Sequence, residues 1–401
     1  MSDLRAEEMF LMGASSRVLH VLSSLDEAYG GPLRLVLDLS ARAEGLGLES
    51  ELIGIGEVKL RDNPLPPGRV HAVRSGFLDG YAYSPALRAW LRQNLNRFDG
   101  AVIHGAWTYA GWAAAVELRA AKVPYAYFPH GMLERWAVGG QGRMKQAKKL
   151  LYWKFRESQV CRGACCTFFT TRREMQLAAV PIPEPRRILR PYGIVREPAQ
   201  IDKPQNASLS QQSGHNVALF LGRLHPKKNV DLLIKAWDEA CMPEAWRLVL
   251  AGSGSPPYER ELRQIVRDRG LEMFIQFAGF VSGVDKQYLL QRADWFLLPS
   301  SQENFGVAVL EAVQHGCAVA ISDQVYLAES FRRDSEILPV DFDAWVQFFR
   351  GRMRNAEWRD QVSSRDRTHL METYSMDVVV QQWTDTFRTI FPKRIGRRVE
   401  P

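Results

Sequence analysis

The sequence has no apolar run long enough to cross a bilayer, because no segment approaches about 18 consecutive apolar residues. Its first 25 residues also lack the basic segment, apolar core and cleavage site of a secretory signal peptide. We therefore expect a cytoplasmic protein without membrane-spanning helices.

Cysteine is scarce. The chain has five cysteines among 401 residues and no C-x-x-C pair, so neither a disulfide framework nor a thioredoxin-like motif is indicated. Cys161, Cys165 and Cys166 lie in an apolar and aromatic context, which favours free buried thiols over zinc ligands. We expect no bound metal.

A dinucleotide fingerprint is missing too. The glycine-bearing turn AGSGSP (251–256) does not match G-x-G-x-x-G, and it indicates a strand-to-helix turn more than a dinucleotide site.

Acidic residues are few in the first half of the chain. Residues 1–200 hold 27 Lys and Arg against 19 Asp and Glu, whereas residues 201–401 hold 25 against 26. The first half therefore accounts for the net charge of +7. A positive field favours anionic partners such as phosphates, acidic lipids or nucleic acid, without selecting among them.

What the sequence does contain is an alternation of short apolar runs with segments of helical spacing. The composition, 46% hydrophobic and 24% charged, is that of a globular protein, and the length suggests about two domains. In the first half the apolar runs are 17–25, 49–56, 98–105, 123–131 and 165–171. This alternation predicts a parallel sheet covered by helices on both faces.

A polar, proline-bearing stretch at 196–216 interrupts the pattern and is typical of a linker. Strand-like runs then resume at 217–224, 246–254, 274–281, 294–300 and 318–323. We predict one domain over 1–195, a second over 217–375, and a C-terminal helix with a basic tail over 376–401. Two parallel sheets that face each other would leave a cleft at the carboxyl ends of their strands.

Charged residues follow two of the strands predicted in the second half. Glu303 stands in a polar loop after 294–300, and Glu311 lies about one and a half turns into the next helix, whose N-terminus attracts anions. Arg223 stands at the carboxyl end of 217–224 and Lys228 follows it, and two such cations suit a diphosphate. Taken singly, the carboxylates are equally well explained as surface residues, and the cations as a solvated basic turn.

In combination these segments resemble a known family. GRLHPKKNVDLL (222–233) and PSSQENFGVAVLEAVQHGCAV (299–319), with LVLAGSGS and FAGFVS between them, closely resemble glycosyltransferase family 4. The segments YGGP, VIHGAWTYAGWAAA and FPHGMLERWA extend the resemblance to the first half, toward bacterial enzymes of surface-polysaccharide synthesis. The resemblance implies the α/β GT-B fold, with two Rossmann-like parallel-sheet domains facing a central cleft. The C-terminal helix would then cross back to the first domain.

The resemblance also implies an activity. A retaining hexosyltransferase of this family moves a sugar from a nucleotide-diphosphate sugar to a saccharide or polyprenyl-diphosphate-linked saccharide, here for exopolysaccharide, O-antigen or capsule synthesis. The acceptor proton would pass to a donor phosphate oxygen, so that no protein carboxylate serves as nucleophile. No metal, other cofactor or nucleic acid is implied. Two alternatives stay open: another GT-B sugar-nucleotide enzyme of epimerase or phosphorylase type, and a catalytically silent nucleotide-sugar binder.

Roles for individual residues follow from the resemblance alone. Arg223 and Lys228 would bind the diphosphate, Glu303 would position the transferred sugar, Glu311 would hold the ribose, and His130 would contact the sugar or acceptor near the reacting carbon. The remaining donor-binding residues would be Gly30, Gly31, Gly222, Phe280, Val281, Asn304, Phe305, Gly306 and Val307.

Simpler explanations exist for some of these residues. His130 ends an apolar run, where a histidine can merely cap the sheet by hydrogen bonding, and His104 has a weaker claim to a role. The turn at Gly30 and Gly31 is explained by chain reversal alone. The D-x-D at 341–343 resembles a metal motif of other transferases, but it follows the last recognised strand, so we interpret it as a helix start.

The sequence departs from the family pattern at two places. Val325 and Tyr326 stand where many members have glycines close to the donor, so we expect bulkier side chains there to restrict access. Tyr192 stands where an asparagine is common before Gly193.

The segment 142–157 has the composition of a helix that lies on an anionic membrane. We expect Leu151, Tyr152 and Phe155 near one stripe, with Lys145, Lys148, Lys149 and Arg156 around it. A helix that faces the core with a solvated basic side is equally compatible with this pattern.

Overall fold

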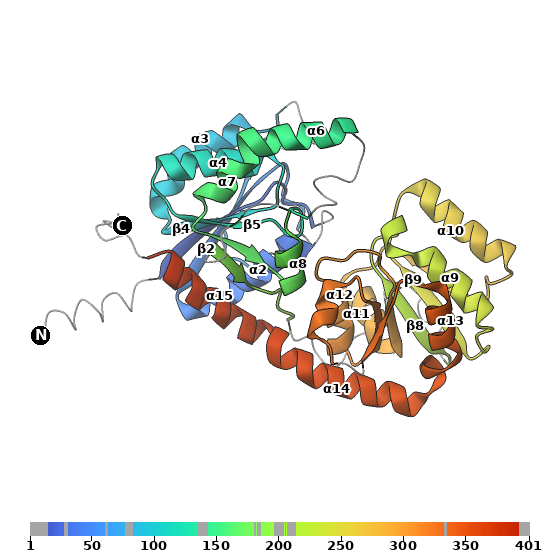
Figure 1. Ribbon diagram of the computed structural model, residues 1–401. Coiled ribbons are helices and arrows are strands. Elements are labelled where there is room, and N and C mark those ends of the chain that lie inside the picture. Colours follow the sequence, from blue (N-terminus) through green and yellow to red (C-terminus); the bar gives the residue numbers. More distant parts are fainter. Residues whose placement is uncertain are drawn as a thin grey trace, which may run out of the picture. The chain divides into compact units, whose positions relative to one another are not determined.

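The structure is a computed structural model that describes residues 15–27, 31–60, 63–76, 83–134, 143–179, 182, 186–195, 204, 206, 214–332 and 335–392. The chain forms two compact units, one made of the residues up to Gly193 together with those from Met376 onward, the other of Ile194–Ser375 (Figure 1). Gly30 and most of the expected linker 196–216 lie outside the described residues.

The first unit is built on a seven-stranded sheet with strand order β3-β2-β1-β4-β5-β6-β7, in which every pairing is parallel. Its strands are β1 (Ser16–Val21), β2 (Leu48–Ile55), β3 (Val70–Val73), β4 (Gly100–His104), β5 (Tyr125–Phe128), β6 (Cys166–Phe169) and β7 (Arg187–Leu189). The strand order reverses between β1 and β4, and ligands of open α/β sheets bind at such a switch point.

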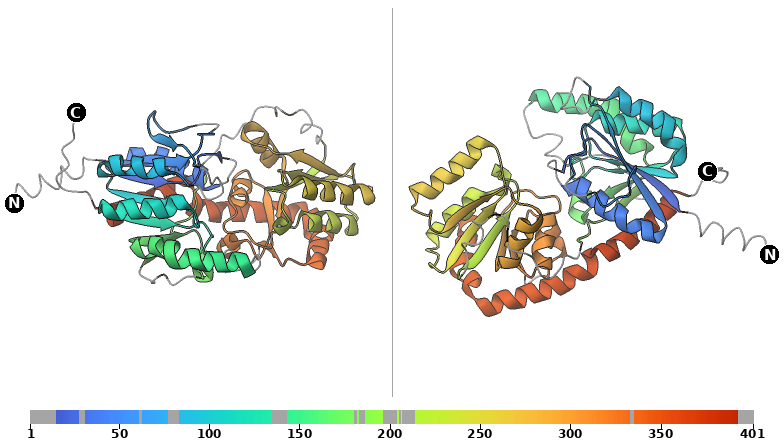
Figure 2. Two further views of the ribbon diagram at one scale, coloured as in Figure 1. Left: turned by 90° about the horizontal axis from the view of Figure 1, so that it is seen from above. Right: turned by 180° about the vertical axis from the view of Figure 1, so that it is seen from behind.

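Helices cover both faces of this sheet, as the alternation predicts (Figure 1). They are α2 (Gly31–Ala43), α3 (Pro85–Asn94), α4 (Tyr109–Ala120), α6 (Arg143–Tyr152), α7 (Ser158–Gly163), α8 (Arg172–Leu177) and α15 (Met376–Ile390). Short 3-10 turns follow α2 at Glu44–Leu46 and α3 at Leu95–Arg97. α4 packs against α3 and α7 on one face, while α2 and α15 lie side by side on the other (Figure 2).

The second unit repeats this architecture with a six-stranded sheet in the order β10-β9-β8-β11-β12-β13, again parallel throughout. Its strands are β8 (Asn216–Leu221), β9 (Trp246–Ala251), β10 (Ile275–Gly279), β11 (Trp295–Leu298), β12 (Ala318–Ser322) and β13 (Glu336–Leu338). The switch point lies between β8 and β11. The predicted α/β class with two parallel sheets is confirmed.

The helices of the second unit are α9 (Val230–Glu239), α10 (Pro256–Asp268), α11 (Gly283–Arg292), α12 (Val307–Gln314), α13 (Phe342–Arg350) and α14 (Ala356–Tyr374). Short helical turns stand at Pro226–Lys228, Tyr326–Ser330 and Arg352–Arg354. α9 packs against α10 and α13, and α12 packs against α11 and α14 (Figure 1).

α15 completes the first unit although it is last in the sequence. Trp383, Phe387 and Phe391 are each 1% exposed, and the Trp383 ring lies 4.6 Å from Phe168 and 5.6 Å from Phe128. Gly100 allows the close approach of Phe391, because a Cβ there would lie 2.2 Å from the Phe391 ring. The helix is therefore part of the core of the first unit.

The expected single helix over 142–157 is interrupted. α6 ends at Tyr152, and a π-helical turn, η5 (Trp153–Glu157), joins it to α7. Leu151 and Phe155 are 61% and 54% exposed, as the predicted apolar stripe requires, but Tyr152 turns inward and donates its hydroxyl to the Thr108 carbonyl oxygen at 2.8 Å. The prediction was wrong for the Tyr152 hydroxyl, which points toward the loop before α4, and Tyr152 lies in the last turn of α6, before the π turn begins.

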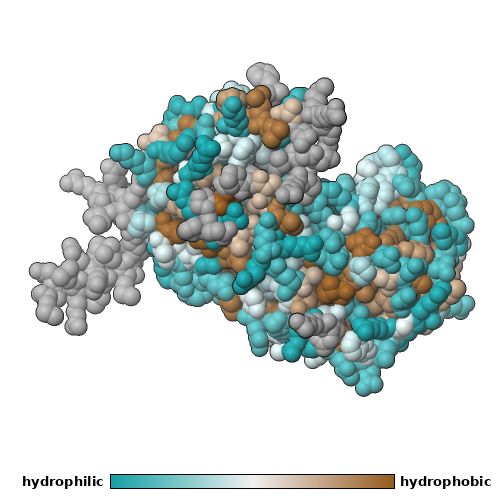
Figure 3. Space-filling model, in the orientation of Figure 1, coloured by the Kyte–Doolittle hydropathy of each residue, from teal (hydrophilic) through white to brown (hydrophobic). Residues whose placement is uncertain are grey.

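Two of the expected solvated cations also fold back onto aromatic rings. The Lys149 ammonium lies 5.4 Å from the centre of the Trp107 ring, and the Arg156 guanidinium lies 3.5 Å from that of Trp112. Lys148 is exposed, whereas the side chain of Lys145 is outside the described part. Apolar surface is visible over α6 in Figure 3, beside hydrophilic side chains.

The cysteines are free, but the expected burial is correct only in part. Cys161 and Cys166 are buried, whereas Cys165 is exposed. Cys165 precedes β6, and its amide donates to the Tyr125 carbonyl oxygen at 2.8 Å, while Cys166 is the first residue of the strand. In the described ranges, no helix is both long enough and apolar enough to span a bilayer.

Candidate functional site in the second unit

The predicted diphosphate and sugar residues come together at the switch point of the second sheet. The turn after β8 carries Lys228, the loop after β11 carries Glu303, and the Lys228 ammonium forms an ion pair with the Glu303 carboxylate. Both side chains are less than a quarter exposed. The pairing joins residues 75 positions apart, which neither local pattern alone predicts.

Several hydrogen bonds fasten these two loops to each other. The Ser301 amide donates to the Lys227 carbonyl oxygen at 2.8 Å, the Lys227 ammonium donates to Gln302 Oε1 at 3.0 Å, and Asn229 Nδ2 donates to the Pro299 carbonyl oxygen at 2.8 Å. The ion pair therefore rests on a fixed framework and is not a chance contact between mobile side chains.

Burial makes Lys228 an unusual cation. Burial, with the nearby charges of Arg223 and Lys227, lowers the pKa of Lys228 to about 8. The ion pair with Glu303 opposes this shift, because an anion favours the charged ammonium. Arg223 itself is exposed. Lys228 is thus held in place by its ion pair, whereas Arg223 is accessible to an anion.

Glycines allow the backbone to approach closely behind Arg223. A Cβ at Gly252 would lie 1.8 Å from the Gly222 carbonyl oxygen, and a Cβ at Gly254 would lie 1.9 Å from that of Leu224. The turn AGSGSP therefore supports the cationic loop, which agrees with its interpretation as a strand-to-helix turn.

Glu311 is also held by a lysine. Glu311, in α12, accepts a hydrogen bond from the Lys286 ammonium of α11 at 2.7 Å, with side chains 22% and 26% exposed. Sequence reasoning missed Lys286. Its position within the first turns of the helix after FAGFVS was the available signal, but nothing in the sequence paired it with Glu311.

The N-terminus of α12 stands beside Glu303. Gly306 has φ +88°, a left-handed conformation that favours glycine, and an added Cβ there would lie 3.2 Å from Val325 and 3.5 Å from the Glu303 side chain. Val307 is the first residue of the helix. The Asn304 Oδ1 atom is buried and has no hydrogen-bond partner among the described residues, whereas the Phe305 side chain is 2% exposed and belongs to the core.

The bulky residues at 325 and 326 do not stand on an open loop. Val325 and Tyr326 are 0% and 4% exposed. The Glu303 amide donates to the Gln324 carbonyl oxygen at 3.2 Å, and the Tyr326 amide donates to the Glu303 carbonyl oxygen at 3.0 Å. The segment thus fixes the backbone of Glu303, and its two bulky side chains are buried. Restricted donor access at this loop stays a prediction.

Phe280 and Val281 differ sharply in exposure. Phe280 is 65% exposed, whereas Val281 is 8% exposed and joins the core below it. An exposed phenyl ring after the edge strand β10 suits stacking on a base, while Val281 can offer only its backbone and one edge of its side chain.

In the first unit, His130 lies after β5 with φ +51°. Its Nδ1 lies 2.6 Å from the Tyr192 hydroxyl, and its Nε2 lies 3.0 Å from His104 Nδ1. The hydrogen bonds expected of a histidine that caps the sheet are therefore present. A contact of His130 with a sugar stays a prediction. Gly31 is the first residue of α2, and its neighbour Gly30 lies outside the described part.

The D-x-D at 341–343 is a helix start, as predicted. The Asp341 carboxylate accepts a hydrogen bond from the Ala344 amide at 3.0 Å and caps α13. Within the described ranges, no group of three His, Cys, Asp or Glu side chains gathers as a metal site requires.

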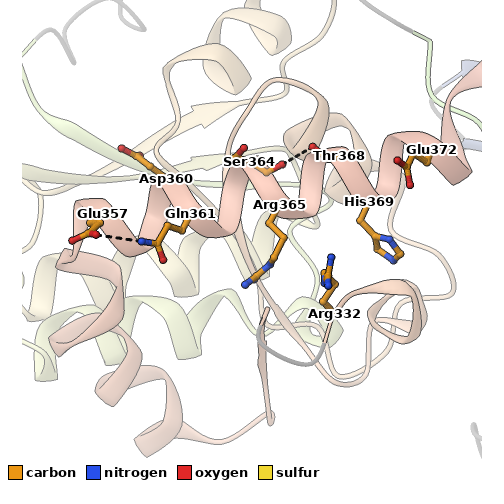
Figure 4. A pocket seen from close by; sticks show the side chains of 9 residues that line it. All are labelled: Arg332, Glu357, Asp360, Gln361, Ser364, Arg365, Thr368, His369 and Glu372. Atoms are coloured by element: carbon orange, nitrogen blue, oxygen red, sulfur yellow. Dashed lines mark hydrogen bonds between the residues drawn. The ribbon is translucent and has the colours of Figure 1, made fainter.

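A cavity of about 740 Å³ lies elsewhere in the second unit, along α14. Figure 4 shows that its walls are charged and polar side chains, most of them from that one helix. None of the residues predicted to bind the donor lines it. The lining residues are Arg332, Glu357, Asp360, Gln361, Ser364, Arg365, Thr368, His369 and Glu372.

Both units match known families. Residues 13–193 match the family described as glycosyl transferase 4-like domain, and residues 202–342 match the family described as glycosyl transferases group 1. The two matches coincide with the two sheets.

Curated relatives match parts of the chain. O-antigen chain mannosyltransferase B of Escherichia coli is 29% identical over 157 residues, which are 39% of this chain and 41% of that protein. An uncharacterised glycosyltransferase of Methanocaldococcus jannaschii is 26% identical over 193 residues, which are 47% of this chain and 49% of that protein. The chain thus spans about half or less of the length of these relatives.

Among solved structures, HepE of Anabaena in complex with UDP and glucose superposes with a TM-score of 0.74 at 17% identity, covering 93% of this chain and 100% of that one. This likeness establishes the fold. With a family match on each unit and the same two-sheet architecture, the chain belongs to the group 1 glycosyltransferases of the GT-B fold.

Proposed function

We propose that this protein transfers a hexose from a nucleotide-diphosphate sugar to a saccharide or lipid-linked saccharide in surface-polysaccharide synthesis. The proposal rests chiefly on one observation, the arrangement of Lys228, Glu303 and Arg223 at the switch point of the second sheet. Cations and a carboxylate at the carboxyl ends of β8 and β11 suit a sugar diphosphate. The names of the E. coli and Anabaena proteins support a polysaccharide product and a nucleotide-linked donor.

We further propose that transfer proceeds with retention of anomeric configuration. The acceptor oxygen bonds to the anomeric carbon on the side from which the nucleotide leaves, while the bond from that carbon to the phosphate oxygen breaks. The acceptor proton passes to a phosphate oxygen of the departing diphosphate. Glu303 forms no covalent bond. It positions the sugar, while Arg223 and Lys228 stabilise the negative charge that develops on the diphosphate.

Because two cations can neutralise the leaving group, we propose that the reaction needs no metal. Turnover in the presence of excess EDTA checks this. Activity that disappears with chelation and returns with Mg²⁺ would contradict it.

The main test is release of nucleoside diphosphate from a panel of UDP-, GDP- and ADP-sugars, with and without a lipid and saccharide extract as acceptor. We expect release from one donor, strongly stimulated by the extract. Lys228→Met should abolish it, whereas the matched control Lys235→Met, at a lysine paired with Asp231 on α9, should not.

Other outcomes of this assay distinguish the alternatives. Binding of a sugar nucleotide without release indicates a silent binder. Release of nucleotide together with free or epimerised sugar, independent of acceptor, indicates an epimerase type. Turnover that requires orthophosphate indicates a phosphorylase type. Each of these results would overturn the transfer proposal.

We also propose that α6 and η5 touch the inner face of the cytoplasmic membrane, where a polyprenyl-diphosphate-linked acceptor would be found. Leu150, Leu151 and Phe155 are each more than half exposed, and Lys148 and Lys154 beside them are exposed cations. Exposed apolar side chains next to cations suit an anionic lipid surface.

Flotation with vesicles tests the membrane contact. We expect binding to vesicles that contain phosphatidylglycerol and little binding to pure phosphatidylcholine. Leu151→Glu should reduce binding, whereas Met273→Glu, at a methionine 76% exposed in the second unit, should not. Equal binding by both variants would contradict the proposed surface.

A further inference from the structure

Three histidines and a tyrosine form one hydrogen-bonded chain inside the first unit. His20 Nδ1 lies 3.0 Å from His104 Nε2, His104 Nδ1 lies 3.0 Å from His130 Nε2, and His130 Nδ1 lies 2.6 Å from the Tyr192 hydroxyl. The three imidazoles lie near the carboxyl ends of β1, β4 and β5. The chain therefore crosses the switch point of the first sheet, where this class of fold binds ligands.

The hydrogen-bonded chain is buried at both ends, because Tyr192 is 5% exposed, and only His130 within it reaches the surface. His20 is 1% exposed and His104 is 5% exposed, whereas His130 is only half-buried. His20 Nε2, at the inner end, is buried and has no hydrogen-bond partner among the described residues. His130 is thus the imidazole from which the chain can act on a ligand.

All three imidazoles are neutral at physiological pH. Burial lowers the pKa of His20 and of His130 to about 3, and burial followed by the neighbouring imidazoles holds the pKa of His104 well below its usual value. A neutral imidazole has one nitrogen that donates and one that accepts. Because each link joins Nδ1 of one ring to Nε2 of the next, placing one proton determines the positions of the others.

Two proton arrangements satisfy the chain. In one, Tyr192 donates to His130 Nδ1 and all three rings are protonated on Nε2. In the other, all three are protonated on Nδ1 and Tyr192 accepts. A separation of 2.6 Å is typical of a hydroxyl donor, since N–H donors prefer about 2.9 to 3.0 Å. The first arrangement is therefore favoured.

A neighbouring carboxylate holds His130 in its unusual backbone conformation. Glu174 Oε1 accepts a hydrogen bond from the Gly131 amide at 2.7 Å, and Glu174 Oε2 accepts from the amide and the hydroxyl of Thr170 at 2.7 and 2.6 Å. Glu174 is 1% exposed. A buried carboxylate that fixes the residue after His130 is consistent with a ring that must be placed accurately.

We propose that His20, His104 and Tyr192 are positioning residues that fix the tautomer and the orientation of His130. His130 Nε2 donates to His104 and Nδ1 accepts from Tyr192, so both ring nitrogens are occupied and the ring is fixed in one orientation. His130 would then present one fixed ring face to the sugar or acceptor, and the Tyr192 hydrogen bond would persist in the complex. This consequence rests on the proposed function, whereas the proton arrangement of the chain does not.

The test is nuclear magnetic resonance of the full chain labelled with ¹⁵N-histidine, in which two-bond correlations distinguish protonated from unprotonated ring nitrogens. The protein has eight histidines, and single His→Gln variants assign their ring signals. We expect His20, His104 and His130 to stay neutral from pH 5 to 8 with the proton on Nε2. A mixture of tautomers in the native protein would overturn the proposal.

Tyr192→Phe removes the hydroxyl with little change in shape. We expect the ring signals of His104 and His20 to change together with those of His130, although neither touches residue 192 through a hydrogen bond. Tyr125→Phe is the matched control, because Tyr125 is equally buried and donates its hydroxyl to the Val160 carbonyl at 2.9 Å, outside the chain. Changes confined to His130 would contradict a coupled chain.

Kinetics supply the functional half of the test. Tyr192→Phe should lower kcat roughly tenfold and leave the donor KM within about twofold, while Tyr125→Phe leaves both unchanged. An unchanged kcat would contradict a functional role for Tyr192, but it would not affect the evidence that the hydrogen bonds of the three histidines are coupled. If the native protein transfers no sugar, the proposed function fails, and the resonance result still decides whether the chain exists.

Discussion

At the scale of single residues, the candidate site of the second unit contains two cation–carboxylate pairs, Lys228 with Glu303 and Lys286 with Glu311. The sequence predicted Arg223, Lys228, Glu303 and Glu311 as residue types near strand ends. It could not predict that Lys228 pairs with Glu303, because that contact depends on the adjacency of β8 and β11, which are separated by two strands in the sequence.

Glu311→Ala should weaken donor binding about tenfold or more and leave the fold intact. The carboxylate is partly exposed and its ion pair with Lys286 is worth little to stability, whereas hydroxyl groups bound by a carboxylate contribute about 1 to 2 kcal/mol. Isothermal titration with the donor found in the assay measures the effect. Glu272→Ala, at a glutamate outside the site, is the control, and unchanged affinity in Glu311→Ala would contradict the ribose role.

The lowered pKa of Lys228 predicts a pH dependence. Below pH 8 the ammonium is charged and attracts the diphosphate, and above pH 8 it loses its proton, so kcat/KM for the donor should fall as pH rises through about 8. Lys228→Arg keeps a cation at high pH and should shift or remove the fall. A profile of kcat/KM that stays flat from pH 7 to 9 in the native protein would contradict this origin.

At the scale of elements, apolar periodicity predicted the long strands and helices well, since each is a continuous buried run. β3, β7 and β13 escaped prediction because they have three or four residues and lie at or next to sheet edges, where little is buried. The π turn η5, which ends at the buried Glu157, was also not predicted, because the apolar repeat continues through it without a sequence signal.

Glu157 predicts a pH-dependent stability of the first unit. Burial raises its pKa to about 7, against hydrogen bonds from the Tyr127 hydroxyl and the Trp107 amide. The unfolded chain releases this proton at about pH 4.5, so the free energy of unfolding should decrease by about 3 kcal/mol between pH 4.5 and 7. Urea denaturation across this range measures the slope.

Glu157→Gln should flatten that part of the profile. The control is Glu117→Gln: the Glu117 carboxylate is paired with Arg88 and Arg92 and its pKa is lowered, so it contributes below this window. A slope between pH 4.5 and 7 that is identical in Glu157→Gln and the native protein would refute the assignment.

The contact between β4 and α15 gives a packing prediction. Gly100→Ala should destabilise the first unit by about 1 to 3 kcal/mol, because its Cβ would overlap the buried Phe391 ring. Gly45→Ala, where no atom lies within 4 Å of the added Cβ, should have little effect. Urea denaturation measures the free energy of unfolding of both variants. Equal values for Gly100→Ala and Gly45→Ala would contradict the prediction, because they would show that the Phe391 ring moves aside at no cost.

At the scale of the whole molecule, the first unit is discontinuous in sequence. The switch points of both sheets followed from the fold class, but the route by which residues 376–390 complete the first core depends on aromatic contacts between distant parts of the chain. The same holds for the histidine chain, whose members lie in or after separate strands. Sequence reasoning named His104, His130 and Tyr192 separately but did not connect them, and it missed His20.

A chain that ends at Ser375 should keep the second unit folded and lose the first. Without α15, the faces of Phe128 and Phe168 that pack on Trp383 are exposed to water. Hydrogen–deuterium exchange should show protection only in β8–β13 and their helices. Native-like protection of β1 and β4 in the shortened chain would contradict the role of α15.

This discontinuity sets an order for biosynthesis. All residues of the second unit are translated before α15, the last helix of the first unit. We therefore expect the second unit to finish folding before the first. Until α15 is in place, the aromatic side chains that it covers on the first sheet lack their partner, and we expect the nascent protein to bind chaperones that recognise exposed apolar surface.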